Sequence, residues 1–205
     1  MLTFTIKAQG AAVLLGLMTA LPAVASPGGF EVGGTADPAS ISGTVASFQT
    51  NLGNPNNGNA PGTTGGRREI NWDGGGGVNA NAVSGTPFNG FLQTRGALFT
   101  TPGTGFIQAP PSGGPQNGLV GQFNNATYGT IFSTFSPLRD FTPIGSTTTE
   151  VTFFIPGTNG TVGATVDGFG AVFSNVQLSN SARIDFFDPN GNLLTGGDRH
   201  QSRRT

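Results

Sequence analysis

From Phe88 onwards the sequence is a succession of short apolar stretches separated by turns rich in glycine, proline and asparagine. Stretches of this length, without interleaved helical patterns, are typical of antiparallel β-sandwiches and not of βαβ folds. The segment 149–155 is rich in β-branched and aromatic residues, and Asp-Pro-Asn-Gly at 188–191 predicts the turn of a hairpin. The strands that we expect are 96–101, 105–109, 119–123, 131–135, 140–143, 149–155, 166–174, 183–188 and 192–194.

The composition favours a folded domain in spite of its high glycine content. Glycine supplies 35 of the 205 residues and charged residues make up only 9%. Disordered chains have few aromatic residues and a high net charge, whereas this chain has 17 phenylalanines and a formal net charge of −1. We therefore predict an all-β fold, an antiparallel jelly-roll-like β-sandwich with one short N-terminal amphipathic helix.

The helix is expected just before the β-rich part. Asp37 is a suitable N-cap, Pro38 suits the first helical position, and Gly53 suits the end of the helix. Four apolar residues recur on one helical face, which we expect to pack against a sheet: Ile41, Val45, Phe48 and Leu52. A helix that binds a partner through this face is the alternative.

Residues 1–25 follow the pattern of a cleavable secretion signal. Lys7 precedes the apolar stretch 11–18, and Ala23 and Ala25 are small residues placed to fit a signal peptidase. The stretch is shorter than the about 20 apolar residues that a membrane-spanning helix needs. We expect cleavage after Ala25, no transmembrane segment thereafter, and a secreted or extracellular location, with the periplasm or cell surface as alternatives. The divisions expected are a signal peptide at 1–25, a flexible leader at 26–36, a single domain at 37–195 and a disordered polar tail at 196–205.

Several chemistries are excluded by what the sequence lacks. There is no cysteine, so disulfides, thiol chemistry and cysteine zinc sites are excluded, and His200 is the only histidine. Lys7 is the only lysine, so the chain without its leader has eight arginines against ten acidic residues. This balance is too weak and too mixed to attract nucleic acid, which we do not expect as a partner.

Candidate ligand-binding residues gather in the segment 67–73, which we expect to be a strand. Glu69, Asn71 and Asp73 would share one face of it and precede four glycines, so their oxygens are candidate calcium ligands. The alternative is an ion-pair network of Arg67 and Glu69 with Arg95 or Arg139. A catalytic carboxylate pair is not expected, because Glu69 and Asp73 would lie about 13 Å apart along a strand, beyond the spacing of glycosidase carboxylates.

The aromatic residues offer a second candidate surface. Trp72 and Tyr128 have flat faces that could stack on a sugar ring, but the alternation of Trp72 with Ile70 favours a place in the core. The sequence has no Gly-x-Ser-x-Gly motif, and His200 lies in the polar tail, so a serine triad is not expected. We do not expect the chain to be an enzyme.

The segment 65–74 (GGRREINWDG), together with 91–99, 101–106, 135–139, 151–158 and 168–176, resembles a family of uncharacterised exported bacterial proteins. Some members of that family carry a carboxy-terminal PEP-CTERM sorting segment. The resemblance implies a jelly-roll-like β-sandwich and an extracellular location, and it brings no activity and no functional residues. Family members continue with further strands beyond the hairpin, whereas this chain turns polar at Gly196. That departure predicts a truncated or frame-shifted chain with a missing strand and one bare sheet edge.

These observations predict a secreted, non-catalytic binding module for an extracellular ligand. A glycan or a matrix polymer, bound with or without calcium, is the ligand that we expect. The alternative is a structural protein of the envelope or the biofilm matrix whose surface drives assembly. A hydrolase with a site that the sequence does not reveal comes third.

Overall fold

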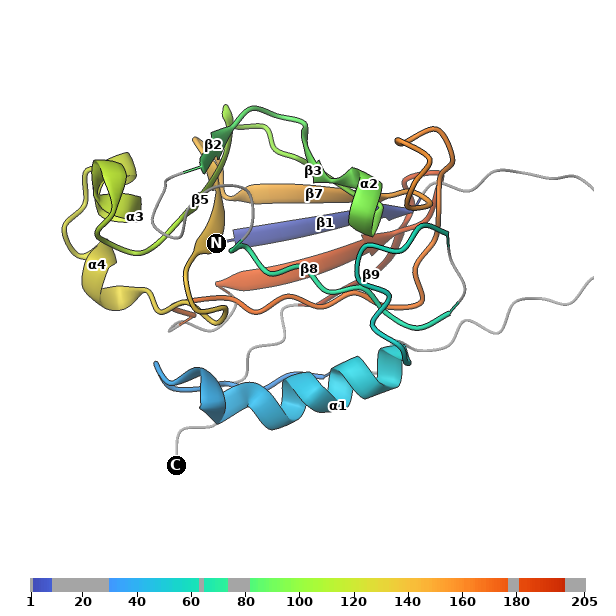
Figure 1. The fold of residues 1–205 in the computed structure, drawn as a ribbon, viewed down its shortest axis with the longest axis horizontal. Helices are drawn as coiled ribbons and strands as arrows, with labels where there is room; N and C mark the ends of the chain where they lie inside the picture. The colour runs from blue at the N-terminus through green and yellow to red at the C-terminus, as the bar shows by residue number, and fades with distance from the viewer. Residues whose placement is uncertain (1, 9–29, 63–64, 74–81, 177–180, 198–205) are drawn as a thin grey trace, which may run out of the picture.

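The computed structural model describes residues 2–8, 30–62, 65–73, 82–176 and 181–197. Its β-strands form a six-stranded sheet with the order β3-β4-β7-β1-β8-β9 and a three-stranded sheet with the order β2-β5-β6 (Figure 1). The strands of the larger sheet are β3 (Phe88–Phe91), β4 (Ala97–Thr100), β7 (Thr148–Phe153), β1 (Leu2–Ala8), β8 (Ala182–Phe187) and β9 (Leu193–Gly197). Those of the smaller sheet are β2 (Ala82–Ser84), β5 (Gly105–Ala109) and β6 (Asp140–Ile144). The prediction of a β-rich fold is confirmed.

Most of the expected strands are present. The strands β4, β5, β6, β7, β8 and β9 each overlap a predicted one, and β8 and β9 form the predicted hairpin. The carboxylate of Asp188 closes the hairpin turn, because its Oδ1 atom accepts hydrogen bonds from the backbone N–H groups of Asn190 and Asn192, both at 2.8 Å. The hydrogen bonds from Asn192 and Asn190 lower the pKa of Asp188.

Three expected strands are not regular strands. Residues 119–123 belong to the helix α3 (Gly118–Phe123), and 131–135 begins at the end of the helix α4 (Tyr128–Ile131). The segment 166–174 forms no strand. A short apolar run fits a buried helical turn as well as a strand, and Leu119 illustrates this, because α3 buries it in a second core cluster. The prediction of a single helix was therefore wrong. Further helical turns are α2 (Leu92–Arg95) and a 3-10 helix at Pro115–Asn117.

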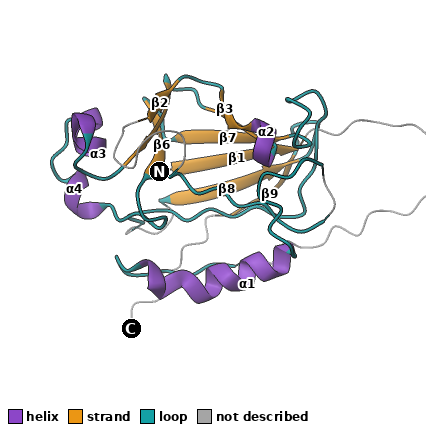
Figure 2. Cartoon of the chain, in the orientation of Figure 1, coloured by secondary structure: helices purple, strands orange, loops and turns teal. Residues whose placement is uncertain are grey.

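The predicted helical segment is present between Asp37 and Gly53, with a 3-10 helix as its first turn. A 3-10 turn at Pro38–Ile41 leads into α1 (Ser42–Leu52), the Asp37 carboxylate accepts a hydrogen bond from the N–H of Ala39 at 2.9 Å, and Gly53 ends the helix with φ +96°. Figure 2 shows α1 lying along one side of the molecule, apart from the strands. Its apolar face meets glycines of a loop and not a strand, since a Cβ atom on Gly170 would stand 2.6 Å from the Phe48 ring.

The strand β1 corrects the prediction of a purely antiparallel sheet. It lies between β7 and β8 and runs parallel to both, so the larger sheet is mixed. In sequence Leu2–Ala8 alternates apolar with polar residues, as a strand does, but it lies within the predicted secretion signal. The apolar stretch 11–18 and the expected cleavage site lie outside the described residues, as does most of the tail, so cleavage stays a prediction.

An aromatic core joins the two sheets. The buried residues Ala97, Phe99, Phe106, Val151 and Phe153 form its centre, with ten partly buried apolar residues around it. Trp72 stacks on Phe141 with ring centroids 4.1 Å apart and planes 8° from parallel, and Phe141 stacks in turn on Phe106 at 4.9 Å. The structure therefore places Trp72 in the core, where no sugar can stack on the face that Phe141 covers.

Candidate functional site

Three arginines fix a polar loop next to the aromatic core. The loop, residues 53–62, joins the end of α1 to the segment that carries the candidate ligand residues, and it contains four asparagines. Arg67, Arg68 and Arg95 donate hydrogen bonds to backbone or side-chain oxygens of this loop. We call residues 53–62 with these three arginines the arginine-held loop.

Arg68 binds the loop at two positions, Gly58 and Gly62. Its Nη1 atom donates to the carbonyls of Gly58 at 2.9 Å and Thr94 at 3.0 Å, and its Nη2 atom donates to the carbonyl of Gly62 at 2.9 Å. Three carbonyls around one planar guanidinium use the fork-like geometry that arginine has and lysine lacks. This geometry ties both ends of the turn at 58–62 to the helix α2, which contains Thr94.

Arg95, the last residue of α2, reaches the same turn. Its Nε atom donates to the carbonyl of Glu69 at 2.6 Å, its Nη1 atom to the carbonyl of Gly58 at 2.9 Å, and Nη1 also bonds to the Asn59 side chain. Burial lowers the pKa of Arg95, an effect opposed by the charge of Glu69. Burial and the charge of Arg95 likewise lower the pKa of Arg68. Two cations that share the Gly58 carbonyl repel each other, so the loop oxygens are needed to hold both.

The ion pair expected at Glu69 is present. Arg67 donates from Nε to the Glu69 carboxylate at 2.6 Å, and from Nη1 to the Gly53 carbonyl and the Asn54 side chain at 3.2 and 2.5 Å. Backbone bonds between Arg67 and residues 55 and 57 form an isolated bridge and no longer strand. The prediction of a strand at 67–73 is therefore wrong: only Arg67 forms a bridge, and the Arg95 guanidinium binds the carbonyl of Glu69.

The three predicted ligand residues make different contacts in the structure. Glu69 pairs with Arg67, Asn71 is exposed, and the Asp73 Oδ1 atom accepts hydrogen bonds from the N–H groups of Leu138 and Arg139, both at 3.1 Å. Within the described residues no three acidic or histidine side chains form a group that could hold a metal ion. The calcium hypothesis gains no geometric support and stays a prediction.

Replacing Asp73 with alanine is expected to lower the free energy of unfolding by about 2–3 kcal/mol. The change leaves two partly buried N–H groups without the Oδ1 atom that accepts from both, and loss of a hydrogen-bonded charged acceptor costs about 1.5–3 kcal/mol. Urea unfolding followed by circular dichroism measures the effect. Asn71→Ala is the matched control, because an exposed side chain should change stability by less than about 0.5 kcal/mol. Equal effects of the two variants would contradict the structural role of Asp73.

The arginine-held loop presents amide groups to solvent. Asn54, Asn56 and Asn59 are exposed on the loop, and the exposed Asn71 follows it in the chain. An amide both donates and accepts hydrogen bonds, so a fixed set of amides can recognise a neutral ligand that carries hydroxyl groups. The sequence indicates Asn71 as a candidate residue, but not the loop. The role of the arginines that hold the loop cannot be predicted from the sequence, because most of their acceptors are backbone carbonyls, which every residue has.

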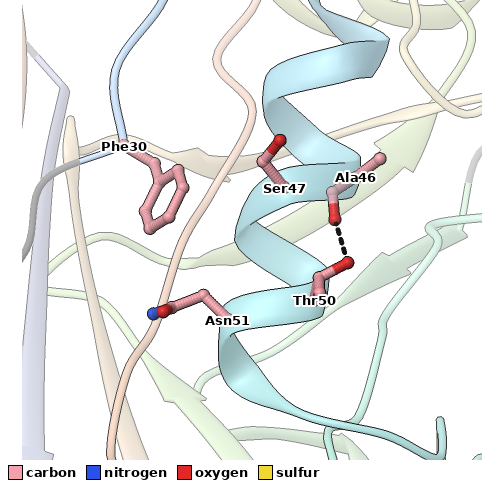
Figure 3. Close-up of a pocket in the computed structure, with 5 residues that line it drawn as sticks. All are labelled: Phe30, Ala46, Ser47, Thr50 and Asn51. Atoms are coloured by element: carbon pink, nitrogen blue, oxygen red, sulfur yellow. Dashed lines mark hydrogen bonds between the residues drawn. The ribbon is translucent and has the colours of Figure 1, made fainter.

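A second, shallower feature lies beside α1. Phe30, Ala46, Ser47, Thr50 and Asn51 line an open groove (Figure 3). The Phe30 ring contacts Phe48 edge to face at 5.6 Å, and the Thr50 hydroxyl donates to the Ala46 carbonyl at 2.9 Å. All five lining residues are uncharged, and the Thr50 hydroxyl serves its own helix, so we regard the arginine-held loop as the better candidate.

In the parts of the chain that the structure describes, none of the helices combines the length and apolar composition needed to span a bilayer. Compared with protein-family models, with curated proteins and with solved structures, the chain has no significant match.

Proposed function

We propose that the chain is an exported, non-catalytic binding module, built as a jelly-roll-like β-sandwich, and that its ligand is an extracellular glycan or matrix polysaccharide. The observation that carries the proposal is the arginine-held loop. Three guanidinium groups fix its carbonyls in place before any ligand arrives. Fixing a loop in advance removes part of the entropic cost that binding would otherwise incur.

The chemistry of the loop favours a polyhydroxyl ligand. Its exposed polar side chains are amides, and the charges of Arg67 and Glu69 are paired with each other. Neutral amides match the alternating donors and acceptors of sugar hydroxyls, whereas a phosphate backbone requires unpaired cations in number. The secretion pattern at 1–25 supports an extracellular meeting with such a polymer.

Asn71→Ala is expected to weaken binding of the best-bound glycan by about tenfold, which corresponds to the loss of one net hydrogen bond of about 1.4 kcal/mol. The processed protein is screened on a glycan array, and the affinity of each variant is then measured by calorimetry. Gln122→Ala is the matched control, because it removes an amide from α3, which lies at the far end of the larger sheet from α2 (Figure 1). Absence of any glycan ligand, or equal loss in both variants, contradicts the proposal.

The same measurement is repeated with calcium and with a chelator. Binding that disappears with the chelator supports calcium ligation by Glu69, Asn71 and Asp73, whereas unchanged binding removes calcium from the proposal.

The alternative function is a structural protein of the envelope or biofilm matrix. One observation favours it: β9 forms an edge of the larger sheet and leaves Leu193 and Leu194 54% and 63% exposed. Exposed edge strands with apolar side chains pair with other chains. Sedimentation of the processed protein at rising concentration, without ligand, separates the two functions. Open-ended assembly supports the structural role, and a constant molecular mass supports the binding module.

A further inference from the structure

A central position of the six-stranded sheet is held by a segment that the secretion pattern assigns to removal. Figure 1 shows β1 between β7 and β8, and Leu2–Ala8 pairs with each of them in parallel register over six residues. If cleavage follows Ala25, β1 leaves with the signal peptide. The strands β7 and β8 then face each other across one empty strand position, and each presents unpaired backbone N–H and C=O groups to it.

We propose that this position, between β7 and β8, binds an extended strand of a partner protein once the chain has been processed. The inference rests on the exported form that the proposed function assumes. Strand addition gives affinity through backbone hydrogen bonds and specificity through alternate side chains. Addition at a sheet edge forms one ladder of bonds, whereas a strand in this position forms two, as β1 does with β7 and β8.

The register defines the core side of the partner strand. Position 4 pairs with Thr149 and Ile184, and position 6 pairs with Val151 and Phe186. Thr149 and Val151 are fully buried, and Ile184 and Phe186 pack against the aromatic core. Because paired residues of neighbouring strands lie on the same face of a sheet, the partner needs apolar residues at positions 4 and 6. The sequence of β1 has phenylalanine and isoleucine there.

The opposite face adds a charge requirement. Position 5 pairs with Glu150 on β7 and with Asp185 on β8, and the Asp185 carboxylate forms an ion pair with Arg183 at 2.7 Å. Like charges in directly opposed positions destabilise a sheet. A partner strand therefore needs a neutral or basic residue at position 5, between two apolar residues.

A second copy of the chain is a poorer occupant. The strand with exposed apolar residues, β9, has the sequence Leu-Leu-Thr-Gly-Gly and already pairs with β8. Its two leucines are adjacent, so they would point to opposite faces of the sheet and leave a glycine where an apolar residue is required. The alternation required by the register is absent from β9, and this favours a partner with a different sequence.

The test uses the full chain exported from a bacterial host, with its amino terminus sequenced after purification. A labelled synthetic peptide of residues 2–8 is the probe, and its binding is followed by fluorescence anisotropy. The peptide is expected to bind the processed protein and to raise its melting temperature. The peptide with Thr5→Pro should bind at least about tenfold more weakly, because proline removes a ladder N–H group. Thr5→Glu should weaken binding more than its neutral match Thr5→Gln.

Each other outcome overturns the inference. Retention of residues 1–25 would make β1 a permanent strand, and equal binding of the Pro-containing peptide would exclude strand addition. Dimerisation that the peptide abolishes by competition would give the position to a second copy. The Asn71→Ala variant keeps this test separate from that of glycan binding, because it should lose glycan affinity and keep peptide affinity. Loss of peptide binding alone therefore contradicts only the strand site.

Discussion

Trp72→Ala lowers the free energy of unfolding by about 3–5 kcal/mol, the cost expected for truncating a large aromatic side chain in a packed core. The indole stacks on Phe141 and meets Phe91 and Phe99 edge to face at 5.6 and 5.7 Å. Phe91 and Phe99 belong to the larger sheet and Phe141 to the smaller one, so the substitution removes contacts with both. Urea unfolding monitored by far-ultraviolet circular dichroism measures the loss without relying on tryptophan emission.

Trp72→Phe is the control for this prediction. A phenyl ring keeps part of the stack on Phe141 and leaves a smaller cavity, so we expect a loss below about 2 kcal/mol. If the alanine variant lost less than about 1 kcal/mol, Trp72 would not belong to the core, and the sugar-stacking interpretation would return.

Asp140→Asn stabilises the protein at pH 8 and removes a dependence of stability on pH. Asp140 lies on β6, where burial raises its pKa from 3.8 to about 7. Its Oδ2 atom is buried without a hydrogen-bond partner among the described residues. Between pH 3.8 and about pH 7 the folded chain binds more protons at Asp140 than the unfolded chain does. The free energy of unfolding therefore falls as the pH rises from about 4 to about 7. The full difference corresponds to at most about 4 kcal/mol.

Thermal and urea unfolding at pH 3, 4, 6 and 8 test this prediction. From pH 4 to pH 8 the free energy of unfolding should fall more in the wild type than in Asp140→Asn. Contributions from other titrating groups are common to both proteins and cancel in this comparison. Asp188→Asn is the control of opposite sign. Hydrogen bonds from Asn192 and Asn190 lower the pKa of Asp188, so its contribution is present at neutral pH and is lost as the pH falls below its ordinary value. Identical slopes in the wild type and Asp140→Asn would contradict the buried position of this carboxyl group.

The sequence predicted those elements whose determinants are local. The strand β7 follows from β-branched and aromatic alternation, and the β8–β9 hairpin from its turn sequence. The helical segment formed by the 3-10 turn and α1 follows from Asp37 before it and Gly53 after it. Residues 119–123 were predicted wrongly because a run of this length is equally compatible with a helical turn and a strand. β1 was missed for a different reason. Leu2–Ala8 has the alternation of a strand, but the charged and apolar pattern around it favoured a secretion signal.

The candidate site was predictable only in part. Proximity in sequence identified the pair of Arg67 and Glu69. The contacts of Arg68 and Arg95 with the carbonyl of Gly58 join residues 10 and 37 positions apart in the chain. No side-chain pattern encodes such contacts, since the acceptor is backbone. Asp73 was expected to bind a ligand, but it binds backbone N–H groups 65 and 66 residues away.

The stack of Trp72 on Phe141 also makes the molecule its own optical reporter. Trp72 is the only tryptophan of the chain, and it lies where the two sheets meet, in the segment tied at Glu69 by Arg95 and at Asp73 by the N–H groups of Leu138 and Arg139. Any event that separates the sheets or displaces that segment changes the polarity around a single indole. The wavelength of its emission maximum therefore reports whether the contact between the two sheets is intact. No label is needed, and no second tryptophan contributes to the signal.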